Sequence, residues 1–227
     1  REKLVEIAAE ATDELIEKKR FTAANKLPTN EFKGLKVDGA GNVYAYWDSG
    51  YVIHPIGSSV WQVNRPSSED FGDCDAGTGM AGVQDMALDP TTGQLAFALS
   101  GGVVFKRGDD WLCWPIGAGM LDAPVRVLEI AANGDVWIGT ERGASWYNDE
   151  AGWRSFIAPA ALTNGVVTEI DVSDDQRVFI KAGAWTQITL ESGTFERGVE
   201  HRKDVADVSP YFEDAVFPVE KILIDGD

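Results

Sequence analysis

A near-constant interval between small-residue turns is the feature of this sequence that most restricts its fold. Four stretches align, and each carries alternating apolar residues, a polar turn, a second run with an aromatic residue, a turn of small residues and a third run. The first turns of the four stretches align at Gly41, Gly93, Gly134 and Gln176, at intervals of 52, 41 and 42 residues. A four-stranded unit of about 40–45 residues is the size of one β-propeller blade, so the pattern predicts an all-β propeller.

Each aligned stretch is followed by a candidate fourth strand, which completes the unit. We predict four blades over residues 32–64, 83–115, 125–158 and 167–198, within a repeat region that covers residues 28–227. An insertion at residues 64–82 explains the long first interval, and residues 219–227 are predicted to form the first strand of a further blade. The prediction is therefore a β-propeller or propeller segment with about four four-stranded blades. Either the chain belongs to a larger ring, or its last strand closes a small one.

The first 27 residues differ from the repeats in composition and in the spacing of their apolar residues. They contain no glycine, and their apolar residues recur at spacings of three and four, with acidic residues on the opposite side. This spacing predicts an N-terminal amphipathic α-helix over residues 1–27, ended by Pro28. Such a helix would pack on the propeller or mediate assembly through residues 1–26. The apolar positions on its stripe are Leu4, Ile7, Ala8, Ala11, Leu15 and Ile16.

An excess of acidic residues limits the partners that the chain can bind. It has 37 Asp and Glu against 20 Lys and Arg, which gives a formal net charge of −17. A chain of this charge repels phosphate backbones and anionic lipid, so nucleic acid is not expected as a partner. No uninterrupted apolar run approaches the roughly 18 residues of a membrane-spanning helix, so this segment is not expected to insert into a membrane.

The two cysteines give no motif of their own. Cys74 and Cys113 lie 39 residues apart and match no zinc or haem spacing. A disulfide would form between them in an oxidising compartment, and two buried free thiols are the alternative. The sequence leaves both interpretations open.

The third unit carries the most specific motif of the chain. Residues 133–140 read Asn-Gly-Asp-Val-Trp-Ile-Gly-Thr, and Gly143 and Trp146-Tyr147 follow them. This string resembles the two-component-regulator propeller repeat. The resemblance implies a propeller that acts as the input or recognition module of a larger bacterial signalling or scaffold protein. It also implies a periplasmic or other extracytoplasmic location, with the cytoplasm as the alternative.

Two long connections are the predicted recognition surface. Residues 64–82 and 198–218 each join a fourth strand to the next first strand, and such connections are expected around the mouth of the central channel. We predict that this face binds a protein partner or a small ligand. Its candidate contact residues are Asp70, Asp73, Asp75, Tyr211 and Phe212.

The carboxylates of the first connection allow a metal site. Asp70, Asp73 and Asp75 alternate with glycines, and Ca²⁺ prefers oxygen ligands of this kind. The loop lacks the full ligand series of an EF-hand, so a solvated acidic loop is the competing interpretation. Calcium is the one cofactor that the sequence suggests, and otherwise none is expected.

Catalytic motifs are sparse, which favours a non-enzymatic recognition domain. His54 and His201 lie in different units, and no G-x-S-x-G elbow occurs. Residues 77–82 match G-x-G-x-x-G, but an acidic loop precedes them and a strand follows, which does not suit a dinucleotide site. Some propellers of similar repeat are metal-dependent lactonases or lyases, and this is the alternative function. It would use the inner-strand carboxylates Asp85, Glu129, Glu169 and Asp171.

Overall fold

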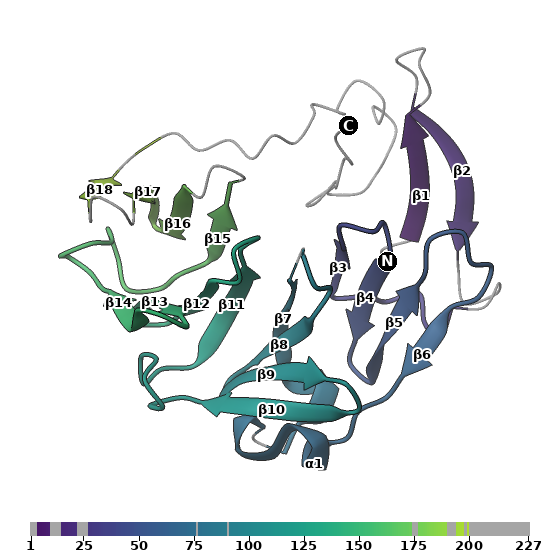
Figure 1. Cartoon of the computed structure of the whole chain (residues 1–227), viewed down its shortest axis with the longest axis horizontal. Coiled ribbons are helices and arrows are strands. Elements are labelled where there is room, and N and C mark those ends of the chain that lie inside the picture. Colours follow the sequence, from purple (N-terminus) through teal and green to yellow (C-terminus); the bar gives the residue numbers. More distant parts are fainter. Residues whose placement is uncertain are drawn as a thin grey trace.

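The computed structural model describes residues 27–75, 77–89, 91–173, 177–188 and 199, and the backbones of Leu4–Ala9, Leu15–Phe21, Thr189 and Thr194–Arg197. The described chain is all-β, with four antiparallel four-stranded sheets in a propeller arrangement (Figure 1). The predicted fold is therefore confirmed. The further strand predicted at residues 219–227 lies outside the described residues.

Each sheet is a blade whose strands follow one another in chain order. Blade one contains β3 (Gly34–Val37), β4 (Val43–Trp47), β5 (Gly50–His54) and β6 (Gln62–Asn64). Blade two contains β7 (Val83–Leu88), β8 (Leu95–Leu99), β9 (Gly102–Arg107) and β10 (Asp110–Pro115). Blade three contains β11 (Val125–Ile130), β12 (Val136–Thr140), β13 (Gly143–Asn148) and β14 (Gly152–Phe156). Blade four contains β15 (Glu169–Val172), β16 (Val178–Ala182), β17 (Ala184–Thr189) and β18 (Thr194–Arg197).

The first strands of successive blades are neighbours at the centre of the arrangement. β3 packs beside β7, β7 beside β11, and β11 beside β15. Figure 1 shows these strands facing the common axis, with the fourth strands at the perimeter. Side chains of the first strands can therefore meet at the axis although they are far apart in the sequence.

Glycines at the second turns are required by a close approach of the backbone. A Cβ atom on Gly50, Gly102 or Gly143 would lie 2.2–2.3 Å from a carbonyl oxygen of the fourth strand of the same blade. Gly102 and Gly143 also have φ values of 153° and 142°, which L side chains rarely adopt. The repeated glycines of the sequence therefore mark places where a side chain does not fit.

The sequence predicted aromatic side chains between blades, and Phe97 and Trp137 confirm it, since Phe97 packs on blade one and Trp137 on blade four. Trp47 instead packs in a cluster within blade one. Phe97 and Trp137 are fully buried, and Trp47 and Phe179 are 6 % exposed. The Trp137 ring stacks on Phe156, with 5.5 Å between ring centroids. Complete burial of one such side chain stabilises the fold by about 1.5–3 kcal/mol, so the interfaces between blades are the main apolar core.

The predicted N-terminal helix is wrong. β1 (Leu4–Ala9) and β2 (Leu15–Phe21) occupy that segment and pair as an antiparallel hairpin. Short apolar runs fit a helix and a strand equally well by periodicity, and the β-branched residues Val5, Ile7 and Ile16 favour the strand. Within the described residues, no helix is long and apolar enough to cross a membrane.

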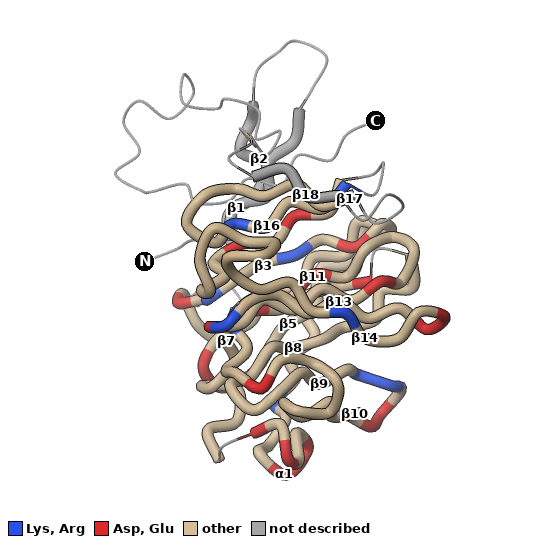
Figure 2. The backbone as a smooth tube through the Cα atoms, turned by 90° about the vertical axis from the view of Figure 1, so that its left-hand side faces the viewer, with Lys and Arg blue, Asp and Glu red and all other residues tan. Residues whose placement is uncertain are grey.

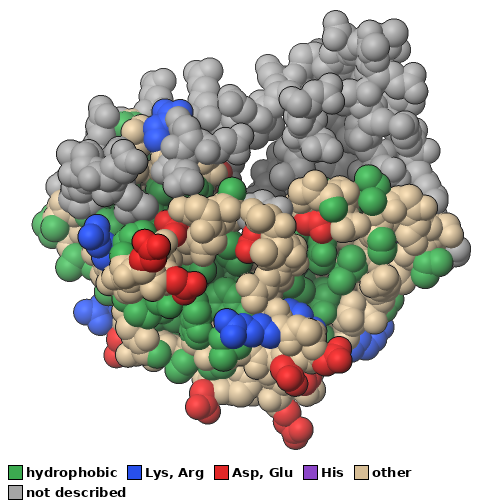
Figure 3. All heavy atoms as spheres, in the orientation of Figure 1, with side chains coloured by type: hydrophobic (Ala, Val, Ile, Leu, Met, Phe, Trp, Pro, Cys, Tyr) green, Lys and Arg blue, Asp and Glu red, His purple; other side chains and the backbone are tan. Residues whose placement is uncertain are grey.

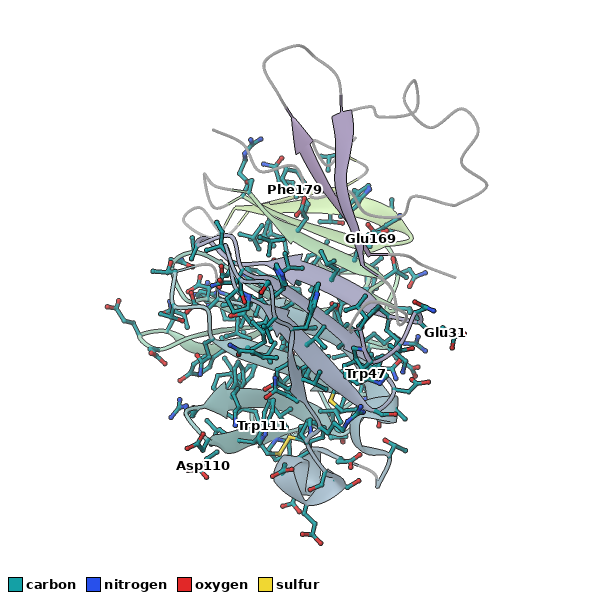
Figure 4. All side chains as sticks on the ribbon, turned by 90° about the vertical axis from the view of Figure 1, so that its right-hand side faces the viewer. Glu31, Trp47, Asp110, Trp111, Glu169 and Phe179 are labelled. Atoms are coloured by element: carbon teal, nitrogen blue, oxygen red, sulfur yellow. A yellow bond between two sulfur atoms is a disulfide. The ribbon has the colours of Figure 1, made fainter. Side chains whose placement is uncertain are left out.

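The insertion in residues 65–82 contains the described α-helical turn and carries the disulfide. Helix α1 (Ser68–Phe71) and the 3-10 turns η2 (Gly72–Cys74) and η3 (Gly79–Gly82) follow one another there. Cys74 forms a disulfide with Cys113 of β10, which decides between the two interpretations of the cysteines. Phe71 is fully buried against Trp111 of β10, at 5.2 Å between ring centroids. Figure 4 shows Trp111 beside the disulfide.

The position of α1 and η2 corrects one expectation. These elements pack on β10, and Figures 1 and 2 both place α1 at the perimeter of blade two. The sequence predicts this connection around the mouth of a central channel. Phe71 and the Cys74–Cys113 disulfide instead hold it against the outer strand.

Candidate functional site

Charged side chains from four inner strands and one neighbouring strand form the candidate site at the propeller axis. Equivalent register positions identify them: Lys36 pairs with Tyr44, Glu129 with Trp137, and Asp171 with Phe179. Side chains two residues apart in a strand share a face. Asp85 and Glu169 each stand two residues before this register position, so their side chains point to the same face of their strands as the side chains at that position. We call the following residues the axial cluster: Lys36, Asp85, Glu129, Glu169, Asp171 and Lys181.

Lys36 is the central cation of the axial cluster. Its ammonium donates a hydrogen bond to Glu129 Oε2 at 2.9 Å, which joins blade one directly to blade three. The two side chains are 22 % and 27 % exposed. Burial alone would lower the pKa of the Lys36 ammonium, but Glu129, Asp85 and Asp171 outweigh it and raise the pKa above its ordinary value. Lys36 therefore stays charged among three carboxylates.

Asp85 joins blade two to blade three through its carboxylate. One oxygen accepts a hydrogen bond from the Met86 N–H at 2.8 Å, and the other accepts one from the Leu128 N–H at 3.0 Å. The register of β7 shifts between Val83 and Asp85, next to this contact. The register shift therefore lies beside the Asp85 carboxylate, which the two hydrogen bonds hold at the axis. The charge of this carboxylate helps to raise the pKa of Lys36.

Blade four adds a second ion pair. Lys181 Nζ lies 2.6 Å from Glu169 Oε1, directly across the β15–β16 pair, and both side chains are about two-fifths exposed. The same ammonium lies 5.5 Å from the centre of the Trp185 ring. With this pair, the axial cluster contains four carboxylates and two ammonium groups. Its excess negative charge suits a ligand that brings a positive group.

The predicted loop carboxylates Asp70 and Asp75 are engaged within their own loop. Asp70 accepts hydrogen bonds from the Ser67 N–H at 2.6 Å and the Ser67 hydroxyl at 2.9 Å, and the Ser67 N–H is the main cause that lowers its pKa. Burial alone would raise the pKa of Asp75, but the N–H groups of Gly79 and Thr78 outweigh it and lower the pKa. Both carboxylates therefore stabilise local turns.

The other predicted contact residues are Asp73, Tyr211 and Phe212, and of these the structure describes Asp73. Asp73 lies exposed in η2. Among the described residues, no group of three or more His, Cys, Asp or Glu side chains is arranged to hold a metal ion. Tyr211, Phe212 and His201 lie outside the described residues, and His54 packs against Trp61 with 4.6 Å between ring centroids.

Sequence reasoning named four of the six axial residues, but only for the alternative enzyme. It missed Lys36 and Lys181. The turn alignment contained a signal for Lys36, because Lys36 stands five residues before Gly41, as Glu129 does before Gly134 and Asp171 before Gln176. Lys181 is on a second strand, and only the pairing of Glu169 with Lys181 reveals it.

Figure 3 shows one face of this ring, where acidic side chains lie near the centre and at the rim with apolar ones between them. The fold and the axial cluster thus define a β-propeller with a charged axis. No family model and no curated protein matches the sequence.

Several solved structures are similar in fold. The virginiamycin B lyase of Staphylococcus aureus has a TM-score of 0.52 at 15 % identity, over 73 % of this chain and 54 % of the lyase. The structure described as YCF48 bound to D1 peptide has a TM-score of 0.56 at 12 % identity, over 84 % and 59 %. An extracellular domain described as part of a hybrid two-component system of B. thetaiotaomicron has a TM-score of 0.54 at 17 % identity, over 75 % and 23 %. The chain thus spans less than two thirds of each, and the likeness shows the fold.

Proposed function

We propose that this chain is a non-enzymatic recognition domain whose axial cluster binds a basic peptide segment of a protein partner. The observation that carries the proposal is the excess of carboxylates at the axis, where Asp85, Glu129, Glu169 and Asp171 face two lysines. A guanidinium or ammonium group placed there gains charge-assisted hydrogen bonds in a partly desolvated setting. The net charge of −17 steers cationic partners toward the whole molecule.

The setting we propose is the outside of a bacterial cell, as a sensor or scaffold domain of a larger protein. The Cys74–Cys113 disulfide supports an oxidising compartment. The repeat motif in residues 133–147 resembles regulator propellers, and a similar fold occurs in an extracellular domain of a described two-component system. The fold is also similar to that of YCF48, whose structure is described with a bound peptide.

A second proposed partner surface is the acidic insertion at the perimeter. Asp73 is exposed there, and Figure 2 shows acidic residues gathered at α1. A partner bound through Asp70, Asp73 and Asp75 would approach the side of the ring, together with Tyr211 and Phe212 if the connection at residues 198–218 lies nearby. Calcium binding at the three aspartates is the corresponding cation hypothesis.

The alternative function, a metal-dependent lyase or lactonase, uses the same inner carboxylates. The geometry favours recognition, because the Lys36 ammonium already lies among the carboxylates of Asp85, Glu129 and Asp171, where a catalytic metal would have to bind. Calorimetric titration with Ca²⁺ and Mn²⁺ separates the two functions. Heat of binding that disappears in an Asp85→Asn variant would support the enzyme, and heat that disappears in Asp73→Asn would support the loop site.

The proposal is tested by titrating a capped peptide with two arginines, and its counterpart with two glutamines, into the chain by calorimetry. We expect the arginine peptide to bind and the glutamine peptide to bind at least about 10-fold more weakly, the value of one charge-assisted hydrogen bond. Glu129→Gln should weaken the arginine peptide by a similar factor.

Glu141→Gln is the matched control, because Glu141 pairs with Arg126 on the exposed surface. Thermal unfolding of both variants verifies that they fold. Equal affinity of the two peptides, or equal effects of the two variants, would overturn the proposal.

A further inference from the structure

We propose that residues 219–224 dock as a further innermost strand on the outward face of blade four, the face turned away from blade three. The inference concerns the continuation of the fold, and it holds whether or not the axial cluster binds a ligand. It assigns a place and a register to a segment that the sequence predicts as the first strand of a blade.

The two faces of blade four are distinguished by strand alternation. Ile170, Ile180 and Ile188 pack in the apolar cluster shared with blade three. The residues between them on the same strands therefore point to the outward face. This set contains Asp171, Phe179, Lys181, Trp185 and Gln187.

The outward face has the character of an interface between blades. Phe179 is only 6 % exposed, which is the burial expected of a side chain between two blades. The Arg177 guanidinium lies 5.7 Å from the centre of the Phe179 ring and covers part of it. Trp137 holds the equivalent position in blade three, where blade four buries it completely. Figure 4 shows Phe179 and Glu169 together in blade four, at the opposite end of the molecule from Trp111.

The segment 219–224 has the sequence of an inner strand. Asp225-Gly226 aligns with Asp38-Gly39 at the end of β3, which places Ile222 in the position of Leu35. Met86, Leu128 and Ile170 hold this position in the other blades, and each is at most 3 % exposed. Ile222 is therefore the residue expected to pack on the preceding blade, here on Phe179.

The same register extends the axial cluster. Lys221 takes the position held by Asp85 and Glu169, and Leu223 takes the position held by Lys36 and Asp171. Similar solved propellers are longer than this chain, so a ring of this kind accommodates a blade beyond the fourth. The occupant we assign is this segment of the same chain.

A disulfide trap tests the assignment. Asp85 contacts the backbone of Leu128 in the next blade, and the equivalent pair for blade four is Glu169 with Ile222. In the full chain, with the native disulfide kept, Glu169→Cys combined with Ile222→Cys should form an intramolecular disulfide under mild oxidation. Peptide mapping identifies the bond.

Two further pairs keep the test decisive. Asp149→Cys with Ile222→Cys places one thiol on an exposed turn of blade three, and it should crosslink at least 10-fold more slowly. Val5→Cys with Glu169→Cys asks whether the β1–β2 hairpin covers the face instead.

A rate for the Glu169 and Ile222 pair no faster than the Asp149 control would overturn the assignment. So would a crosslink between two molecules, which would identify a second copy as the occupant, or faster crosslinking through Val5. These readouts involve no ligand, so they are independent of the peptide titration.

Discussion

Replacing Lys36 with methionine tests the electrostatics of the axis in the most direct way. The substitution keeps the length and apolar stem of the side chain and removes its charge. Glu129 then loses a hydrogen bond of 2.9 Å, and it stays about three-quarters buried beside Asp85 and Asp171. Removal of one partner of a fully buried ion pair costs about 3–5 kcal/mol. Because both partners are about one-quarter exposed, we expect a loss of about 2–3 kcal/mol in the free energy of unfolding.

The assay is urea and thermal unfolding of the two proteins at pH 7. For a chain of this length, a loss of this size lowers the melting temperature by roughly 5–10 °C. Lys33→Met is the matched control, because Lys33 pairs with Asp48 at 2.7 Å but the two side chains are 36 % and 69 % exposed. That control should cost less than about 1 kcal/mol.

The raised pKa of Lys36 adds a dependence on pH. A lysine whose pKa is raised by folding contributes stability that is fully present below its unfolded value of 10.5, and this contribution is lost as the pH rises through the folded value. The stability difference between wild type and Lys36→Met should therefore shrink above about pH 10.5. An equal loss in Lys36→Met and Lys33→Met, or a difference that grows with pH, would refute the reasoning.

Three other predictions concern the scaffold. Gly143→Ala should lower the free energy of unfolding by about 2–4 kcal/mol, because its Cβ would meet a fourth-strand carbonyl at 2.3 Å. Gly134→Ala, with open space around it, should lower it by no more than about 1–2 kcal/mol. Similar urea midpoints for the two variants would contradict the claim. Replacing Cys74 and Cys113 by alanine should cost about 4 kcal/mol by the chain-entropy estimate for a 39-residue separation, and an unchanged melting temperature would contradict it. Burial raises the pKa of Tyr51 to about 12, so Tyr51→Phe should remove an ultraviolet tyrosinate transition near that pH and leave the earlier ones.

The sequence was most informative where structure repeats. Small residues return at each second turn because a fourth-strand carbonyl excludes a side chain at Gly50, Gly102 and Gly143. Aromatic residues return because Phe97 fills the space between blades one and two, and Trp137 fills the space between blades three and four. These constraints act within one blade or between neighbours, so a periodic pattern records them and the fold could be predicted.

The N-terminal segment was predicted wrongly because its pattern is ambiguous. Leu4, Ile7 and Ala8 suit a helical stripe, while the pairing of β1 with β2 uses the same run as a strand. A hairpin of two strands also gains its stability from neighbouring structure, which local spacing does not record.

The candidate site was found only in part, for a different reason. Lys36 and Glu129 are 93 residues apart, and their contact depends on how blades one and three are placed about the axis. The acidic loop was predicted as a site because of its composition. In the structure, the Asp70 and Asp75 carboxylates accept hydrogen bonds from backbone N–H groups of their own turns. Proximity of carboxylates in the sequence was a weaker guide to function than equivalence of position between blades.

The central claim is that recognition occurs at the propeller axis and not at its perimeter. A nuclear magnetic resonance titration of the ¹⁵N-labelled chain with the arginine peptide tests it most directly. The account predicts the largest shifts at the amides of Met86 and Leu128, because both donate hydrogen bonds to the axial carboxylate of Asp85. Shifts confined to α1 and η2, with those two amides unmoved, would contradict it.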